Sequence, residues 1–169
     1  MAKSLEQRPY PLWEFLSNEF GIDVAFSVFA PYHGANIKVK VIDNFTVESS
    51  MELIPSNTNY VGTHFGGSLY SMCDPFYMLI LVKNLGPEYL VWDKSAAVDF
   101  ISPGTGVVKA RFHIPSDEIV KIKQIVAEKR KVDMDFHTQI LDEAGKIVAN
   151  LKKGLYIRRI LKKNDKIHL

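Results

Sequence analysis

The residues best suited to chemistry lie between Asn59 and Pro75, in the segment NYVGTHFGGSLYSMCDP. Gly66 and Gly67 directly precede an apolar run that is predicted to form a helix. Amides of the first helical turn lack internal hydrogen-bond partners and lie at the positive end of the helix dipole. They are therefore suited to stabilise an anion or an oxyanion. The glycines also fit a purely structural use, in which they let the loop pack tightly under the sheet.

Asp74 is a carboxylate in an apolar stretch, flanked by Met72, Cys73 and Phe76. Acidic side chains are rarely buried without a partner or a function. One interpretation is a general base or a nucleophile. The other is structural: Asp74 accepts a hydrogen bond and closes a kink imposed by Pro75, because proline removes one helical hydrogen bond. The residues alone favour neither interpretation.

The spacing of these groups has a consequence for assembly. Gly66 and Asp74 are eight residues apart, which is about 12 Å along a helix. One substrate carbonyl cannot contact both. If both act on the same atom, the amide of one copy must meet the carboxylate of another, and we expect a homodimer with paired sites. Further pairing of dimers into tetramers is left open.

The elements that position these groups follow from hydrophobic periodicity and turn residues. We expect an α+β domain in which one antiparallel sheet wraps around a long buried helix, with extra short helices. A loop from Pro55 to Gly67 precedes the buried helix. The expected elements are a helix at 11–20, a hairpin at 37–53, the apolar helix at 68–85, strands at 91–101 and 107–114, a helix from 115 to about 131, and strands at 134–141 and 146–157.

Composition is that of a folded globular chain. Of 169 residues, 47% are hydrophobic and 24% charged, so collagen-like, coiled-coil and disordered classes are excluded. A net charge of +2 gives no support for nucleic acid as a partner. The longest apolar stretch, from Leu69 to Val82, is too short to span a bilayer, and no signal peptide is visible. With the lone Cys73, this predicts a cytoplasmic protein without a membrane partner.

Four of these residues carry a resemblance to a known family. Asn59, Gly66, Gly67 and Asp74 match the spacing of hotdog-fold thioesterases of the phenylacetate-degradation type, with Phe65 where that family has a histidine. The stretches YVGTHFGGSLY, DPFYMLILVKNLG, VWDKSA and LYIRR resemble, more closely, a bacterial branch named domain of unknown function 4442. The resemblance covers about residues 30–160.

The resemblance implies a hotdog fold and hydrolysis of an acyl thioester. It gives Asp74 the role of general base or nucleophile, Gly66 that of the amide that polarises the thioester carbonyl, and Asn59 a place near that carbonyl. It implies no cofactor other than the coenzyme A of a small-molecule acyl-CoA substrate. One domain would span 1–169, with an N-terminal helical cover at 1–33 and a basic tail at 160–169.

Further residues are assigned to the substrate side of this site. Gly67 and Phe65 would line it, and His64 is either a substitute for the missing histidine or a loop residue without a function. Ser95 would hydrogen-bond the catalytic water. Tyr77 would line an acyl tunnel or simply belong to the core.

The other charged residues are interpreted mainly as structural or solvated. Asp93 and Lys94 would form a structural salt bridge. Seven bases fall between Lys152 and Lys166, and such a run is usually solvated, although it would also suit the phosphates of coenzyme A. The histidines lack metal-ligand spacing, so we expect no metal.

Two rival functions remain. A hotdog dehydratase or hydratase would need a catalytic histidine beside a carboxylate, and only His64 is available for that. A non-catalytic acyl-binding or CoA-binding protein is favoured by Phe65 in place of the family's histidine.

Overall fold

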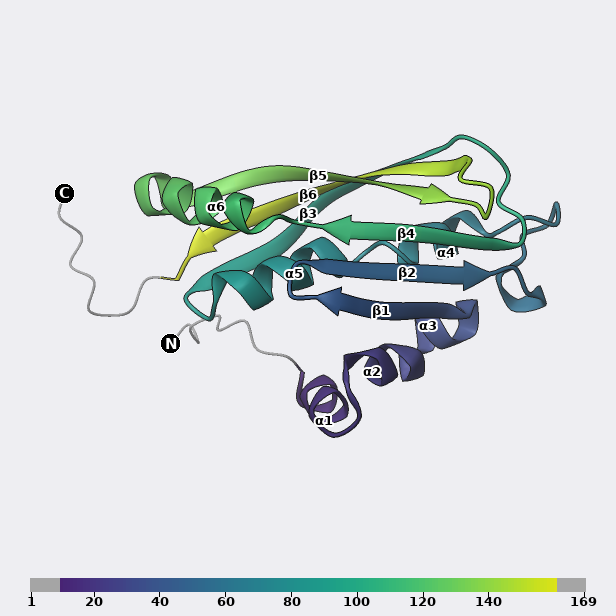
Figure 1. Cartoon of the computed structure of the whole chain (residues 1–169), viewed down its shortest axis with the longest axis horizontal. Coiled ribbons are helices and arrows are strands. Elements are labelled where there is room, and N and C mark those ends of the chain that lie inside the picture. Colours follow the sequence, from purple (N-terminus) through teal and green to yellow (C-terminus); the bar gives the residue numbers. More distant parts are fainter. Residues whose placement is uncertain (1–9, 161–169) are drawn as a thin grey trace.

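The computed structural model describes residues 10–160. Its centre is a six-stranded sheet in which neighbouring strands run antiparallel, in the order β1-β2-β4-β5-β6-β3. The strands are β1 (Ile37–Asp43), β2 (Thr46–Glu52), β3 (Tyr89–Phe100), β4 (Val107–His113), β5 (Lys131–Leu141) and β6 (Ile147–Arg159). The sheet curves over a buried helix (Figure 1), so the expected α+β architecture is confirmed.

The helices fall into three groups around this sheet (Figure 1). Three short ones lie beside strand β1, two follow each other under the sheet, and one connects β4 to β5 at the far end. They are α1 (Pro11–Phe20), α2 (Ile22–Val28) and α3 (Ala30–Ala35), then α4 (Gly66–Ser71) and α5 (Phe76–Leu85), and finally α6 (Ser116–Lys129). A short 3₁₀ helix, η1 (Pro55–Asn57), lies in the loop after β2. The helices predicted at 11–20 and from 115 to about 131 are thus confirmed as α1 and α6.

The central helix is not continuous, which corrects the prediction of one helix at 68–85. A turn at residues 72–75 separates α4 from α5. Pro75 has no backbone N–H and ends the regular hydrogen-bond pattern. Side chains from elsewhere satisfy the freed carbonyls: the Tyr32 hydroxyl donates to the Ser71 carbonyl at 2.9 Å, and the Ser49 hydroxyl to that of Met72 at 2.6 Å. The break is therefore built into the packing.

Helix α5 is buried on most sides, as its apolar sequence predicts. Phe76, Tyr77, Ile80 and Leu81 are each at most 3% exposed. They pack against the inner face of the sheet, where Phe112 is fully buried and lies 4.9 Å, centroid to centroid, from Phe76. Each such side chain contributes about 1.5–3 kcal/mol through burial. Along β4, buried and exposed residues alternate, which is the period of two expected for a sheet with one solvated face.

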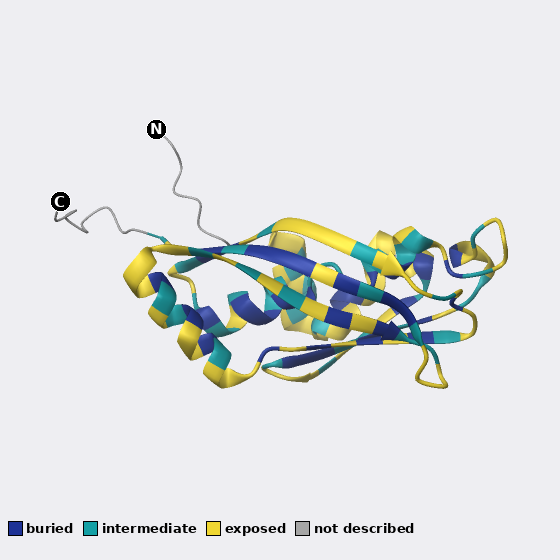
Figure 2. Cartoon of the chain, turned by 90° about the horizontal axis from the view of Figure 1, so that it is seen from above, coloured by how far each residue is buried: buried dark blue, intermediate teal, exposed yellow. Residues whose placement is uncertain are grey.

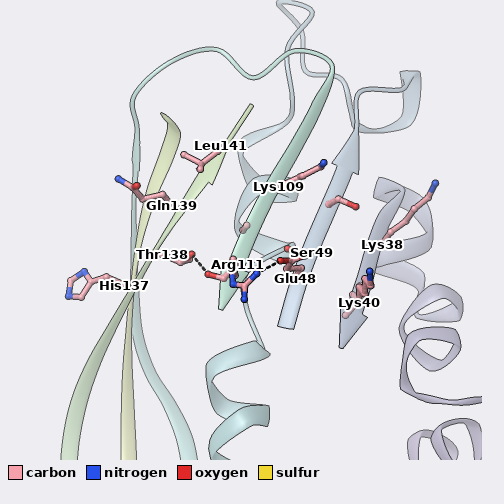
Figure 3. A pocket seen from close by; sticks show the side chains of 13 residues that line it. Lys38, Lys40, Glu48, Ser49, Lys109, Arg111, His137, Thr138, Gln139 and Leu141 are labelled. Atoms are coloured by element: carbon pink, nitrogen blue, oxygen red, sulfur yellow. Dashed lines mark hydrogen bonds and ion pairs between the residues drawn. The ribbon is translucent and has the colours of Figure 1, made fainter. Parts of the chain in front are cut away.

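The sheet opens between β4 and β5. These strands pair only at Lys109 with Leu141 and Ala110 with Ile140. Side chains replace the missing ladder bonds beyond that point. The Thr138 hydroxyl donates to the Arg111 carbonyl at 2.8 Å, a contact drawn in Figure 3, and the Tyr77 hydroxyl donates to the His137 carbonyl at 2.5 Å.

The N-terminal helices lie beside β1, and α2 and α3 continue the series to Ala35. Trp13 contacts Phe26, and Phe26 stacks on Tyr32, which ties α1, α2 and α3 to one another. Residues 1–9 of the predicted cover and residues 161–169 of the predicted basic tail lie outside the described residues.

Candidate functional site

Four polar side chains meet where the break in the central helix faces strand β6. The Lys153 ammonium donates to Asp74 Oδ1 at 2.6 Å and to the Tyr70 hydroxyl at 3.0 Å, and it lies 3.3 Å from Asp93 Oδ2. The Tyr70 hydroxyl also donates to Asp74 Oδ1. These residues come from α4, the turn after it, β3 and β6, so only the folded chain brings them together.

Lys153 is the centre of this cluster and is almost completely buried. Its side chain is 2% exposed, and it projects from β6 on the face that carries the buried Leu151 and Leu155. Burial alone would lower the pKa of Lys153. The hydrogen bonds with Asp74 and Tyr70 and the nearby carboxylates outweigh burial and raise that pKa, so Lys153 is charged.

Asp74 keeps one oxygen available. Its side chain is 43% exposed. Oδ1 accepts from both Lys153 and Tyr70, whereas no residue among 10–160 donates to Oδ2. Burial and the hydrogen bond to Asp74 raise the pKa of Tyr70, so its hydroxyl remains a donor. Asp74 is therefore a carboxylate fixed at one oxygen and open at the other.

Asp93 is the second carboxylate at Lys153. Its Oδ1 is buried and has no hydrogen-bond partner within the described part of the chain. Burial raises the pKa of Asp93, although Lys153 acts in the opposite direction. The expected pair of Asp93 with Lys94 is wrong, because a bulge in β3 turns Lys94 to the outer face, where it contacts Asp133 at 2.5 Å.

Gly66 and Gly67 begin helix α4, as the sequence predicts. Phe65 precedes them with extended backbone angles, and its carbonyl accepts from Ser68 and Leu69. The amides of the two glycines donate to no residue among 10–160. A Cβ on Gly67 would lie 2.4 Å from the Phe65 ring, and a Cβ on Gly66 would lie 2.9 Å from the ring of Phe100 at the end of β3.

Asn59 and His64 hold the loop before α4. The Asn59 amide donates to the Thr63 hydroxyl at 2.8 Å and to the His64 carbonyl at 3.2 Å, and its oxygen accepts from Val61 and Thr63. The His64 ring is buried, and its Nε2 lies 3.0 Å from the Gly106 carbonyl. Burial lowers the pKa of His64, despite the opposing effect of that hydrogen bond, and so favours a neutral ring.

Ser95 and Tyr77 do not join the cluster. Ser95 lies on the exposed face of β3, where its Oγ would be 2.4 Å from a Cβ on Gly154, the neighbour of inward-facing Lys153. Tyr77 is buried between β4 and β5, where it stacks on Phe136 and where burial raises its pKa to about 12. Its contacts are those of a core residue that closes the gap in the sheet.

A large hollow in the described part of the chain lies away from Asp74. It has a volume of about 710 Å³ on the outer side of the sheet, between β1 and β5 (Figure 3). Lys38, Lys40, Lys109 and Arg111 contribute to its wall, and Arg111 pairs with Glu48 at 2.7 Å. The buried cluster at Lys153 is thus separate from this surface.

Sequence reasoning missed two members of the cluster, Lys153 and Tyr70. In the sequence, Lys153 belongs to the run of seven bases between Lys152 and Lys166, a pattern typical of a solvated surface. A signal for it exists in the alternation of β6, where Lys153 occupies an inward position between Leu151 and Leu155. Tyr70 is one helical turn before Asp74, the spacing at which side chains on a helix meet. Within 10–160, no three His, Cys, Asp or Glu side chains gather as metal ligands would.

Comparison with known proteins defines the family. Residues 21–157 match the domain of unknown function DUF4442. The chain belongs to the DUF4442 family. A search of curated proteins finds no match. No helix in the described part of this DUF4442 protein has the length and apolar character needed to cross a membrane.

Solved structures show the same fold at low sequence identity. A protein of unknown function from Pseudomonas aeruginosa, named a probable thioesterase, matches with a TM-score of 0.72 and 19% identity over 91% of this chain and 98% of its own. A thioesterase from Haemophilus influenzae matches with 0.60 and 13%, over 95% and 99%. A hypothetical thioesterase from Streptococcus pneumoniae, solved with coenzyme A, matches with 0.54 and 15%, over 81% and 95%. The DUF4442 chain therefore has the hotdog fold of these thioesterases.

Proposed function

We propose that this protein hydrolyses an acyl-CoA or a related acyl thioester. The observation that carries the proposal is Asp74, whose Oδ1 is fixed by Lys153 and Tyr70 while the other oxygen is open to a ligand. A carboxylate held in this way is suited to activate water or to attack an acyl carbon. Lys153 balances the charge of Asp74 in the absence of substrate.

In the general-base route, Asp74 removes a proton from water as the water oxygen bonds to the acyl carbon. The negative charge that develops on the carbonyl oxygen is accepted by the unpartnered amides of Gly66 and Gly67. The carbon–sulfur bond then breaks, and the thiolate takes up the proton. In the nucleophilic route, an Asp74 oxygen bonds to the acyl carbon, the carbon–sulfur bond breaks and the thiol leaves. Water then hydrolyses the resulting anhydride, which releases the free acid and restores the Asp74 carboxylate.

The site is proposed to be shared between two copies. Gly66 and Asp74 stand at opposite ends of α4 and the turn after it, too far apart to serve one carbonyl in one chain. Strand β3 offers the contact, because it is a twelve-residue edge strand. Most of its residues from Trp92 to Phe100 are exposed (Figure 2), and these two side chains are 61% and 60% exposed. The unpaired backbone groups of an exposed edge strand are a template on which a strand of another chain can pair.

A non-catalytic acyl-binding protein is the second candidate. It is supported by the close ion pair of Asp74 with Lys153, which competes with a water at that carboxylate, and by Phe65 at the family's histidine position. The hydratase alternative has no such support, because His64 lies against Gly106, on the loop after β3. The coenzyme A bound to the Streptococcus pneumoniae relative supports a CoA thioester as ligand in either case.

The deciding experiment measures hydrolysis of acyl-CoA substrates of several chain lengths by the parent and by Asp74→Asn. We expect a loss of about 10²-fold or more, the usual scale for removal of a positioned base. Asp135→Asn is the matched control, because Asp135 is a carboxylate on the outer face that pairs with Lys152. Equal rates for Asp74→Asn and the parent would contradict catalysis by Asp74. Binding of acyl-CoA without turnover by the parent would favour the second candidate.

A further inference from the structure

A second hollow in the structure is strongly cationic. It has a volume of about 400 Å³ and lies where the end of α6 meets the first residue of β5 and the last residues of β6. Five cations line it and no carboxylate does: Lys129, Arg130, Lys131, Arg158 and Arg159. The whole chain has a net charge of only +2, so positive charge is concentrated here.

These cations are not neutralised by neighbouring side chains. None of the five forms an ion pair within residues 10–160. The closest carboxylate along β5, Asp133, is engaged by Lys94. The α6 C-terminus attracts cations, but its dipole amounts to only about half an elementary charge. Most of the positive charge is therefore available to a ligand.

Two of the cations occupy positions where another residue type would be more stable. Arg130 caps α6 with a φ of 65°, in the left-handed region that favours glycine. Lys131 lies directly opposite Arg158 in the β5–β6 ladder, and like charges in that position repel each other. A purely structural helix end and strand start would not need either arrangement.

The remaining wall of the hollow indicates what kind of anion fits. Tyr156, Val126 and Ala127 add an aromatic and apolar surface to the cationic one. Arginine forks bind phosphate oxygens in pairs, and a flat base can stack on an aromatic ring. The volume lies within the range of small-molecule sites, about 300–1,000 Å³.

We propose that this hollow binds a nucleotide that carries a pyrophosphate. Its phosphates lie against Arg130, Lys131 and Arg158, and its base lies on the Tyr156 side. The same chemistry has two sources, a free nucleoside diphosphate or the nucleotide end of coenzyme A. Only the second source rests on the thioesterase activity proposed above, whereas binding itself does not.

Binding is tested by calorimetric titration of the protein with ADP at low ionic strength, with adenosine for comparison. We expect ADP to bind, adenosine not to bind, and the affinity for ADP to fall by about tenfold in Arg130→Gly and in Lys131→Thr, the usual scale for loss of a charged hydrogen bond. The melting temperature should stay the same or rise in both variants, because each replacement suits its backbone position.

Lys38→Thr is the matched control, since it removes one positive charge from the other hollow, on the outer face of the sheet (Figure 3). Unchanged ADP affinity in this variant supports a defined site. The proposal would be overturned if all three variants weakened ADP binding equally, or if the parent did not bind ADP. It would also be overturned if the protein bound RNA or anionic vesicles and ADP did not displace them.

A kinetic comparison separates the two sources. If the nucleotide of coenzyme A occupies the hollow, Arg130→Gly raises KM for an acyl-CoA but leaves KM for the matching acyl-pantetheine, which has no nucleotide, unchanged. If a free nucleotide is the ligand, both KM values stay the same although Arg130→Gly still weakens the binding of ADP. Should the parent bind ADP yet hydrolyse no thioester, the thioesterase proposal fails and the nucleotide site stands.

Discussion

The Lys153 ammonium lies 2.6 Å from Asp74 Oδ1, across 79 residues of sequence. The lysine is buried, whereas the carboxylate is 43% exposed. Lys153 thus holds Asp74 from the buried side, and no residue among 10–160 donates to the second carboxylate oxygen. Removing the charge of Asp74 and removing that of Lys153 have different consequences. The first leaves a buried ammonium without this partner, which is costly, whereas the second leaves a partly exposed carboxylate that water can solvate.

This asymmetry gives a first prediction. Asp74→Asn leaves Lys153 with Asp93 as its remaining carboxylate, and Lys153→Met leaves Asp74 solvated but without its anchor. We expect the double variant to be more stable than the sum of the two single losses predicts, with a coupling of about 1 kcal/mol, reduced by the exposure of Asp74. Urea unfolding of the four proteins measures it. Strict additivity would mean that the ion pair contributes nothing to stability.

Asp93 gives a prediction for pH. Burial raises its pKa in the folded state, although Lys153 acts the other way, so the folded chain holds this proton more tightly than the unfolded chain. Stability is therefore lost as pH rises from about 3.8 through the folded-state pKa of Asp93. Asp93→Asn removes the ionisable group and with it this loss of stability. The variant should melt higher than the parent at pH 7, and the difference should vanish at pH values below about 4.

Asp117→Asn is a control for which the expected change in melting temperature at pH 7 has the opposite sign. The hydrogen bond from Lys121 lowers the pKa of Asp117, so replacing Asp117 should slightly lower the melting temperature at pH 7 and have no such effect in acid. A lower melting temperature for Asp93→Asn at neutral pH would show that Asp93 is needed by Lys153.

Much of the fold follows from local patterns. The β5–β6 hairpin alternates clearly, and its turn includes Gly145 with a φ of 80°, as glycine allows. Strand β5 begins before the prediction, at Lys131, where Val132 already alternates with Met134 and Phe136. Strand β6 extends to Arg159, because the ladder continues through Arg158 and Arg159, which show no apolar alternation. Alternation marks burial, so it cannot mark the ends of strands that pair outside the core.

The helix break and the cluster depend on distant residues. Pro75 predicts a break in the helix. The hydroxyls of Tyr32 and Ser49, which donate to the free carbonyls at that break, come from other elements. In the same way, β6 alternation places Lys153 inside the protein, while nothing local tells that Asp74 is opposite. Gly66 and Gly67 could be placed at a helix start because helix N-terminal signals are local.

His64 gives a prediction that separates stability from catalysis. It is 3% exposed and hydrogen-bonded to Gly106, so His64→Ala leaves a cavity and an unpaired carbonyl. We expect a loss of about 1–3 kcal/mol in the free energy of unfolding, with kcat for acyl-CoA little changed. His137→Ala, on the exposed face, is the control and should change neither. A collapse of kcat in folded His64→Ala would show that His64 replaces the histidine missing at Phe65.

The proposed sharing of the site between two copies gives the last prediction, and Gly66 makes it testable. Proline suits the first position of a helix, and Phe65 before it has a ψ of 127°, which a following proline requires. Gly66→Pro therefore removes the amide and should keep the fold. Gly66→Ala is the matched control, because it meets the same Phe100 ring and keeps the amide. We expect Gly66→Pro to lose hydrolysis while Gly66→Ala retains it.

Mixed dimers then show whether two copies share each site. Gly66→Pro and Asp74→Asn homodimers should both be inactive, since every site in them lacks one group. A dimer with one chain of each kind contains one intact site, built from the unaltered Gly66 of one chain and the unaltered Asp74 of the other. Co-expression with two tags and purification of the doubly tagged dimer should recover about half of the parental rate. Folded mixed dimers without activity would mean that both groups act within one chain, or that one of them does not act.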